Sequence, residues 1–297
     1  MKSSKVLIAV LGSALLISLA QIIGSWPNTT AVLMNLTAAG GSLSYKTNAV
    51  TQQQFTSRAT PCSVQPVEFL AAQNWLLSQS TEDQQLLEYF NGLCGGTYIE
   101  MGALDGLRYS NSFVFNKAFD WKGLMVELTP PSFKKLQVNR PNELALVNAA
   151  VCSDRQTLHY HEHPFNGAVS GVWEFATPSF RTRYWPTVKV EDLVEIQCQP
   201  LQDIIDQHVT VEYFDFLSLD IEGAELSALK SVEWTRVGFG IIVVEADEHN
   251  VRKNLALRTF VESKGYVFLK DYNRSYWFAN KNFASIYEKV MHASPVA

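Results

Sequence analysis

The stretch from Tyr98 to Ser112, YIEMGALDGLRYSNS, determines how we interpret the rest of the chain. A short apolar run leads into it, and Gly102 and Gly106 lie inside it. The apolar segment FVFNKAF follows it. This is the pattern of a strand, a glycine turn and a helix. Glycine in such a turn permits positive φ and allows a ligand to approach the backbone closely.

The acids beside these glycines, Glu100 and Asp105, indicate which ligand fits the turn. A phosphate site favours bare N–H groups and often a lysine. Carboxylates instead suit a ligand with hydroxyls and a positive centre. S-adenosylmethionine has a ribose diol, an ammonium and a sulfonium. An NAD site is disfavoured, because GALDG lacks the G-x-G-x-x-G spacing and Asp105 would repel a pyrophosphate. An ordinary tight turn is the remaining alternative.

Length and composition limit the possible functions. The 297 residues can form one large domain with an extension, and a hydrophobic content of 47% can supply its core. The net charge of −5 provides no basic surface, so we expect no nucleic-acid partner.

The N-terminus predicts entry into the secretory pathway. Lys2 and Lys5 precede the largely apolar run Val6–Ile23, which is just long enough to span a bilayer. An uncleaved anchor would leave a single-pass protein of the ER or Golgi with its domain in the lumen. Ser18 and Ala20 also fit a signal-peptide cleavage pattern, in which case the protein would be secreted.

The composition divides the chain further. Residues 24–61 are rich in Ser, Thr, Asn and Gln, which is typical of a flexible stem. Glycosylation triplets begin at Asn28, Asn35 and Asn273. The predicted division is a membrane anchor or signal segment (1–23), the stem (24–61), a helical lead-in (62–94), the main domain (95–285) and a tail (286–297).

Four cysteines are present: Cys62, Cys94, Cys152 and Cys198. In an oxidising lumen they can form two disulfides, and the sequence leaves all three connectivities open. Because the chain has no CxxC pair, we predict no metal site.

Strands and helices alternate after residue 95, which predicts an α/β fold with a mostly parallel sheet. The expected strands are Tyr98–Met101, Gly123–Leu128, Ala145–Val151, Leu158–His163, Phe214–Asp220, Gly240–Ala246 and a terminal hairpin of Tyr266–Lys270 with Tyr276–Ala279. The expected helices are within Val64–Phe90 and at Pro131–Val138, Pro200–His208, Glu225–Lys230 and Val251–Lys264. In such sheets ligands bind at the carboxyl ends of the strands.

Acidic residues follow several of these strands. Glu127 ends the second strand, where a carboxylate can accept hydrogen bonds from a ribose diol. Asp220, Glu222 and Glu225 are crowded into one strand-to-helix turn. Such crowding requires a cation or hydrogen-bond donors, and it can raise pKa values so that one carboxylate serves as a general base. His249, after the fifth strand, is a further candidate base.

These motifs together resemble the FkbM family of S-adenosylmethionine-dependent methyltransferases. The resemblance spans about residues 95–282 and rests on the ordered elements YIEMGALDG (98–106), Glu127, NAAV (148–151) and DFLSLDIEGAE (215–225). It implies the class I, Rossmann-like methyltransferase fold, a seven-stranded sheet with a reversed last strand. It also implies transfer of a methyl group to a hydroxyl of a sugar, glycolipid or small metabolite.

The resemblance assigns roles to individual residues. It implies that the methionine end of the cofactor is lined by Glu100, Gly102, Ala103, Asp105 and Gly106. Glu127 would hold the ribose, Asn148 and Ala149 would lie near the adenine, and Asp220, Glu222 and Glu225 would face the methyl-transfer region. The chain departs from the family at Leu104, where Asn is common, and at Ser218, where Lys is frequent.

Two further segments attract attention. His159, His161 and His163 alternate on one predicted strand, and we interpret them as a solvated strand face rather than a metal site. The segment Gly167–Val188, with Arg181, Arg183 and Trp185, is either a cap that recognises an acidic or sugar acceptor or a mobile surface loop.

The sequence therefore predicts a secretory-pathway O-methyltransferase whose acceptor is a hydroxyl of a sugar, glycan or small metabolite. The alternative is a non-catalytic binding or trafficking factor for a protein cargo. Star-like animal proteins similar to the family, which combine an N-terminal anchor with this domain, have such a role.

Overall fold

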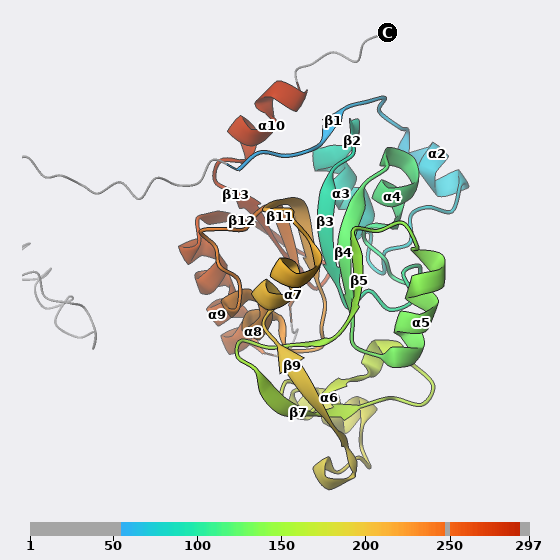
Figure 1. The fold of residues 1–297 in the computed structure, drawn as a ribbon, viewed down its shortest axis with the longest axis vertical. Coiled ribbons are helices and arrows are strands. Elements are labelled where there is room, and N and C mark those ends of the chain that lie inside the picture. Colours follow the sequence, from blue (N-terminus) through green and yellow to red (C-terminus); the bar gives the residue numbers. More distant parts are fainter. Residues whose placement is uncertain (1–54, 247–249, 292–297) are drawn as a thin grey trace, which may run out of the picture. The chain divides into compact units, whose positions relative to one another are not determined.

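A computed structural model describes residues 55–246 and 250–291 (Figure 1). Its main feature is a seven-stranded sheet. The strand order is β12 (Tyr266–Tyr272), β13 (Ser275–Asn280), β11 (Gly238–Glu245), β10 (Tyr213–Leu219), β3 (Thr97–Met101), β4 (Lys122–Glu127) and β5 (Ala145–Asn148). Only β13 among them runs antiparallel to its neighbours. This order, with a reversed strand near one edge, is the class I methyltransferase arrangement that we expected.

The register of the parallel strands brings their carboxyl ends to one edge. Leu219 pairs with both Met101 of β3 and Val244 of β11, and Glu127 pairs with Asn148. The residues that follow these pairs therefore leave the sheet side by side. This confirms the common edge predicted from the alternation of strands and helices.

Helices cover both faces of the sheet because its strands are apolar on both sides. One face packs against α7 (Leu201–His208), α8 (Glu225–Lys230) and α9 (Val251–Ser263) through residues such as Phe214 and Leu217. The other packs against α3 (Glu82–Phe90), α4 (Phe113–Phe119), α5 (Pro130–Asn139) and α10 (Phe283–Met291) through Tyr98, Phe216 and Trp277. The helix α10 runs across the expected domain boundary at 285, and its Tyr287 is fully buried.

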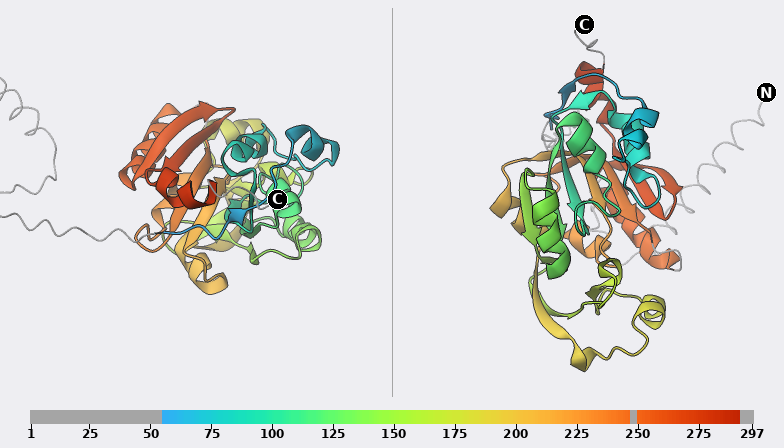
Figure 2. Two further views of the ribbon diagram at one scale, coloured as in Figure 1. Left: turned by 90° about the horizontal axis from the view of Figure 1, so that it is seen from above. Right: turned by 90° about the vertical axis from the view of Figure 1, so that its right-hand side faces the viewer.

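A second, four-stranded sheet lies beyond the carboxyl ends of the first, where Figures 1 and 2 show β7, β9 and α6. Its order is β6 (Ala150–Val151), β9 (Val194–Gln199), β7 (Gln156–His161) and β8 (Gly171–Val172). The strand expected at Ala145–Val151 is therefore two strands. The chain leaves the main sheet after Asn148, and Ala150 pairs with Cys198 of the second sheet instead.

The segment expected to be irregular, Gly167–Val188, has structure of its own. It contains a 3₁₀ turn (Gly167–Val169), β8 and the helix α6 (Pro178–Tyr184). The Thr177 hydroxyl caps α6 by accepting a hydrogen bond from the Phe180 N–H. We did not expect this helix, although Thr177 is a typical capping residue and Pro178 follows it at the first helical position.

The lead-in to the sheet is not one continuous helix. Between α2 (Val67–Ala72) and α3 the chain turns, and the Asp83 carboxylate accepts hydrogen bonds from the Ser78 N–H and hydroxyl. The second helix, α3, starts at Glu82, within the Val64–Phe90 range in which helices were expected. Two short strands, β1 (Thr60–Pro61) and β2 (Leu93–Cys94), pair beside it.

Two disulfides join the four cysteines as Cys62–Cys94 and Cys152–Cys198. The first connects the start of the described chain to β2. The second links the residue after β6 to β9, two strands that pair in the second sheet. Two disulfides were expected, and the structure selects one of the three connectivities.

Several predictions fall outside the described residues: the segment Val6–Ile23, the acceptors Asn28 and Asn35, and His249. No helix within residues 55–246 and 250–291 is long and apolar enough to cross a membrane. Asn273, the third glycosylation triplet, lies in the turn between β12 and β13, and its side-chain amide donates a hydrogen bond to the Ser80 carbonyl.

Candidate active site

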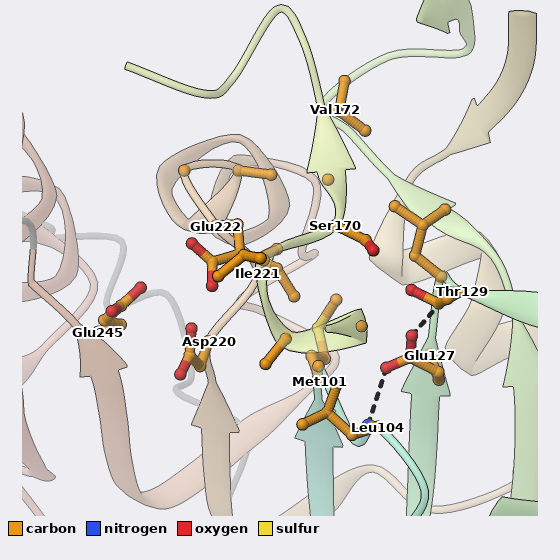
Figure 3. A pocket seen from close by; sticks show the side chains of 18 of the residues that line it. Met101, Leu104, Glu127, Thr129, Ser170, Val172, Asp220, Ile221, Glu222 and Glu245 are labelled. Atoms are coloured by element: carbon orange, nitrogen blue, oxygen red, sulfur yellow. Dashed lines mark hydrogen bonds between the residues drawn. The ribbon is translucent and has the colours of Figure 1, made fainter. Parts of the chain in front are cut away.

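A cavity of about 640 Å³ opens at the carboxyl ends of β3, β4, β10 and β11. Figure 3 shows Glu127 on one side of it and the carboxyl groups of Asp220, Glu222 and Glu245 on the other. Pockets for small ligands commonly have a volume of about 300–1,000 Å³. The cavity therefore has the size and the position expected of a ligand site in this fold.

The glycine turn lies against the end of β10 and requires glycine for two reasons. Gly102 has φ of +77°, and a Cβ atom there would lie 1.9 Å from the Asp220 carbonyl oxygen. Its neighbours Met101 and Leu104 line the cavity, as Gly102 itself does. The close approach of the two strand ends is what brings the turn and Asp220 into one site.

Glu127 is buried at the end of β4, and both of its oxygens accept backbone hydrogen bonds. Oε2 accepts from the Leu104 N–H at 2.8 Å, and Oε1 accepts from the Thr129 N–H at 2.6 Å (Figure 3). Burial raises the pKa of this carboxyl, while the two N–H groups oppose the rise. Each carboxylate oxygen can accept a further bond, so the pair can still receive a ribose diol.

Glu100, also buried, organises the loop that follows the turn. Its oxygens accept hydrogen bonds from the Ser110 hydroxyl at 3.0 Å, the Asn111 N–H at 2.6 Å and the Ser112 hydroxyl. Burial raises its pKa, and the nearby Arg140 guanidinium lowers it. Glu100 lines the cavity, but its hydrogen bonds serve the loop that carries Asn111.

Other residues of the predicted cofactor set lie behind the cavity wall. Ala103, Asp105 and Gly106 are absent from its lining. The Asp105 carboxylate accepts hydrogen bonds from the N–H groups of Leu107 and Arg108, so it closes the turn instead. These residues shape the loop backbone, which sequence alone does not distinguish from ligand contact.

Of the two residues predicted to lie near the adenine, one lines the cavity and the other does not. Ala149 lines the cavity together with Ala150 and Val151. Asn148 does not, because its side-chain amide donates hydrogen bonds to the carbonyls of Glu127 and Leu128, at 2.7 and 2.8 Å. Asn148 thus fixes the end of β4 from the neighbouring strand.

The three carboxyl groups of Asp220, Glu222 and Glu245, here called the acidic cluster, line the opposite wall. Asp220 is exposed at the surface of the cavity. Burial is the largest cause that raises the pKa of each member, and repulsion between the carboxylates adds to it. The cluster therefore binds protons more readily than isolated carboxylates do.

Glu225 has a structural environment, unlike the other acids of its motif. It is fully buried, and its Oε1 accepts hydrogen bonds from the N–H groups of Ile221 and Gly223. Its Oε2 lies 2.7 Å from the Lys253 ammonium. Because Glu225 does not line the cavity, the structure does not support our prediction of a catalytic role for it, and it holds the turn in place.

Glu245, like Asn111, is a site residue that the sequence analysis did not predict. It ends β11, and its Oε1 lies 2.5 Å from Nη2 of Arg274, which comes from the turn before β13. A single acid after the apolar run GIIVV carries no motif. Only the register between β10 and β11 shows that it emerges beside Asp220.

Left-handed backbone is concentrated around the cavity. Leu104, Tyr109 and Glu222 line it with φ of +47°, +62° and +53°. Non-glycine residues adopt this conformation at an energetic cost of order 1–3 kcal/mol, and they gather at functional sites. The Asn that is common at position 104 tolerates left-handed backbone better than leucine does.

The segment Gly167–Val188 was predicted either to cover the pocket or to be a surface loop; together with the preceding Asn166 it is here called the cap. Phe180, Arg183 and Tyr184 of α6 line the cavity, which supports the first interpretation. The Arg183 guanidinium lies 5.1 Å from the centre of the Tyr184 ring. Across the opening, Arg108 lies 4.6 Å from the Tyr109 ring and donates a hydrogen bond to Asn166 of the cap.

The remaining cap residues have structural contacts. Arg181 lies over the Trp173 ring, and Trp185 is buried with its indole N–H bonded to the Val169 carbonyl. The three alternating histidines have separate partners. His159 pairs with Glu174 at 2.6 Å, His161 packs against Trp185, and His163 Nδ1 accepts backbone N–H bonds. No group of His, Cys, Asp and Glu in the described ranges is arranged to hold a metal ion.

Comparison with known families identifies the domain. Residues 100–268, more than half of the chain, match the model of the methyltransferase FkbM domain. The chain belongs to the FkbM methyltransferase family. The domain is therefore that of a methyltransferase that uses S-adenosylmethionine.

Solved structures similar to this FkbM-family protein include three methyltransferases. The FkbM methyltransferase of Methylobacillus flagellatus is 15% identical, with a TM-score of 0.38, and covers 62% of this chain and 43% of its own. A TehB-like SAM-dependent methyltransferase of Corynebacterium glutamicum is 10% identical, with a TM-score of 0.38. The match covers 72% of this chain and 94% of that protein.

A putative caffeoyl-CoA O-methyltransferase of Staphylococcus aureus is 13% identical, with a TM-score of 0.36. The match covers 72% of this chain and 88% of that protein. No curated protein matches the chain. Because these TM-scores are low, the fold assignment rests on the strand order described above.

The residues present fit S-adenosylmethionine. Asn111 lines the cavity, and its Nδ2 donates to the Ser218 hydroxyl at 2.8 Å. Its buried Oδ1 has no hydrogen-bond partner among the described residues, so it can accept from the ligand's ammonium. Ser218, where Lys is frequent in the family, thus orients Asn111. Glu127 suits the ribose, and Val126, Leu128 and Val151 offer apolar walls.

Proposed function

We propose that this FkbM-family protein is an O-methyltransferase that methylates a hydroxyl of a sugar, glycan or small metabolite in the secretory pathway. The observation that carries the proposal is the arrangement of the cavity. A ribose acceptor, Glu127, lies on one side and a proton-binding acidic cluster on the other, with the glycine turn between them. A hydroxyl group must lose a proton when it is methylated, and a carboxylate of raised pKa can take it.

The chain's own side chains divide the work of binding. Glu127 would accept the ribose hydroxyls, and the free Oδ1 of Asn111 would accept the ammonium. S-adenosylmethionine supplies an electrophilic methyl group beside a positive sulfonium. The acidic cluster favours that charge, because Asp220 and Glu222 face the same cavity. Closely positioned reactants need no metal for a displacement of this kind.

The cap supports a hydroxyl-rich acceptor. Tyr109, Phe180 and Tyr184 offer flat aromatic surface around the cavity, and Asn166 and Ser170 offer polar groups between them. The two arginines stacked on tyrosines, Arg108 and Arg183, add hydrogen-bond donors at the rim. Aromatic faces with adjacent donors suit the alternating apolar and polar surface of a sugar ring.

The proposed compartment is the lumen of the ER or Golgi. All four cysteines are paired in disulfides, which persist in oxidising compartments. The predicted anchor or signal segment, Val6–Ile23, would deliver the domain there. Attachment to the membrane through that segment remains part of the proposal, as does glycosylation at Asn28 and Asn35.

Calorimetric titration of the purified full-length protein with S-adenosylmethionine and S-adenosylhomocysteine tests the cofactor site. We expect binding of both, with weaker binding in Glu127→Ala and unchanged binding in the matched control Glu191→Ala, an exposed acid outside the cavity. Incubation with methyl-labelled cofactor and a panel of sugars, glycans and polyols then identifies the acceptor. Label in an ether-linked methyl group supports the proposal.

The alternative function, a non-catalytic binding or trafficking factor for protein cargo, is an outcome of the same experiment. A folded, disulfide-bonded protein that binds neither cofactor nor product would refute the methyltransferase proposal. The search would then turn to cargo proteins. The free Asn111 acceptor and the open cavity favour the enzyme.

A further inference from the structure

We propose that Glu245 and Asp220 share one proton in the cofactor-free protein and act together as the base that takes the proton of the acceptor hydroxyl. The proposal rests on the proposed O-methyltransferase function and adds Glu245 to its chemistry. It further predicts that the positive charge of the cofactor releases the shared proton, so the base becomes available only when the methyl donor is bound.

The positions of the two residues follow from strand register. Leu219 of β10 pairs with Val244 of β11 in a parallel arrangement, so Asp220 and Glu245 leave the sheet as neighbours. Both line the same cavity, and Figure 3 shows their carboxyl groups at the ends of adjacent strands. Glu127 lies across the cavity, beyond the strand that ends at Met101. The base and the ribose acceptor are thus separated.

The two carboxyl groups lie at the ends of adjacent strands and line one cavity. Burial is the largest cause that raises the pKa of each carboxyl group, and repulsion by Asp220 raises that of Glu245 further. Two carboxyl groups in contact hold one proton between them because two adjacent negative charges repel. A positive charge placed beside the pair favours the loss of that proton.

Among the residues that the structure describes, the charged groups around Glu245 come from five elements. They are Asp220 after β10, Glu222 and Glu225 at the start of α8, Arg274 before β13, Lys253 of α9 and, through its effect on Asp220, Glu82 of α3. Lys253 is engaged with the buried Glu225, and Arg274 is engaged with Glu245 itself. Within the described part of the chain these carboxyl groups outnumber the two cations, which favours the binding of one more positive charge.

The proton-transfer step balances in atoms and charge. The acceptor oxygen forms the new C–O bond while its proton passes to a carboxylate of the pair. The C–S bond breaks, and its electron pair stays on sulfur. One sulfonium charge and one carboxylate charge disappear together, so the pair returns to the singly protonated form in which it began. The product complex therefore needs no further proton transfer to reset the base.

Calorimetry measures the predicted proton directly. The full-length protein is titrated with S-adenosylmethionine and with S-adenosylhomocysteine at pH 6.5, in buffers of different ionisation enthalpy. At this pH the α-ammonium groups of both ligands are protonated, since α-amino pKa values are about 7.7–8.0. We expect the sulfonium ligand to release up to about one proton more than the neutral thioether.

Variants assign the proton to the pair. Glu245→Gln removes the difference in proton release between the two ligands, and Asp220→Asn does the same if the first variant does not fold. The matched control Glu262→Gln, an exposed acid of α9, retains the difference. Binding of both ligands with equal proton release overturns this inference and leaves the methyltransferase proposal intact. Binding of neither ligand refutes both.

Discussion

Replacement of Arg140 by methionine tests whether a buried charge network holds the cofactor loop. Arg140 is 1% exposed, at the C-terminal end of α5. Its guanidinium donates hydrogen bonds to the Gly106 carbonyl at 2.9 Å and to the hydroxyls of Ser110 at 3.2 Å and Ser112 at 2.9 Å. Arg140 therefore holds the loop that presents Asn111 to the cavity through three hydrogen bonds.

The expected magnitude follows from what Arg140 leaves behind. Its Nε lies 2.9 Å from the buried Glu143, and its charge also lowers the pKa of the buried Glu100. Removal of the cationic partner from a buried ion pair destabilises a protein by about 3–5 kcal/mol. For a domain of this size that corresponds to a Tm lower by about 6–20 °C. The loop should also loosen, so cofactor affinity should fall.

Urea unfolding followed by circular dichroism, with calorimetric binding of S-adenosylhomocysteine, measures both effects. The control is Arg236→Met, because Arg236 pairs with Asp206 and Glu233 on the surface, where solvent screens the charges. We expect this control to resemble the wild type. An Arg140→Met protein with wild-type stability would refute our account of the network. Lower stability with unchanged cofactor affinity would refute its link to the loop.

Three further outcomes can be measured. Gly102→Ala should lower stability and abolish cofactor binding, because its Cβ would lie 1.9 Å from the Asp220 carbonyl oxygen; wild-type binding would contradict the packing. Replacement of Cys152 and Cys198 by serine opens a 46-residue separation and should lower stability by about 4 kcal/mol in a chemical denaturation, unless the unfolded chain retains structure. Burial raises the pKa values of the acidic cluster in the folded protein. Above about pH 4 the unfolded chain releases protons that the folded protein still holds. The free energy of unfolding should therefore fall as the pH rises from about 4 through the pKa values of the folded state. Glu222→Gln should then raise the Tm of the cofactor-free protein at pH 8, and a lower Tm would contradict this assignment.

Local patterns in the sequence determined the main fold. The nearly continuous apolar runs FLSL and IIVV predicted buried parallel strands because both faces of such strands are covered, and β10 and β11 confirm this. The glycine turn, the acid at position 127 and the acidic turn after residue 219 were recognisable because each occupies the end of a strand. The terminal hairpin and the helix Glu225–Lys230 were also predicted from local patterns.

The tertiary structure decided which of these residues reach the cavity. Asp105, Asn148 and Glu225 belong to the same motifs as the lining residues, but their side chains hydrogen-bond to nearby backbone groups instead. Glu245 lines the cavity without any motif of its own, and Asn111 lines it at the end of the Tyr98–Ser112 stretch, where its residue type alone predicted no role. Sequence spacing fixes where a residue lies along its own strand. The direction and partners of its side chain depend on the register of neighbouring strands and on segments far away in the chain, and these exist only after folding.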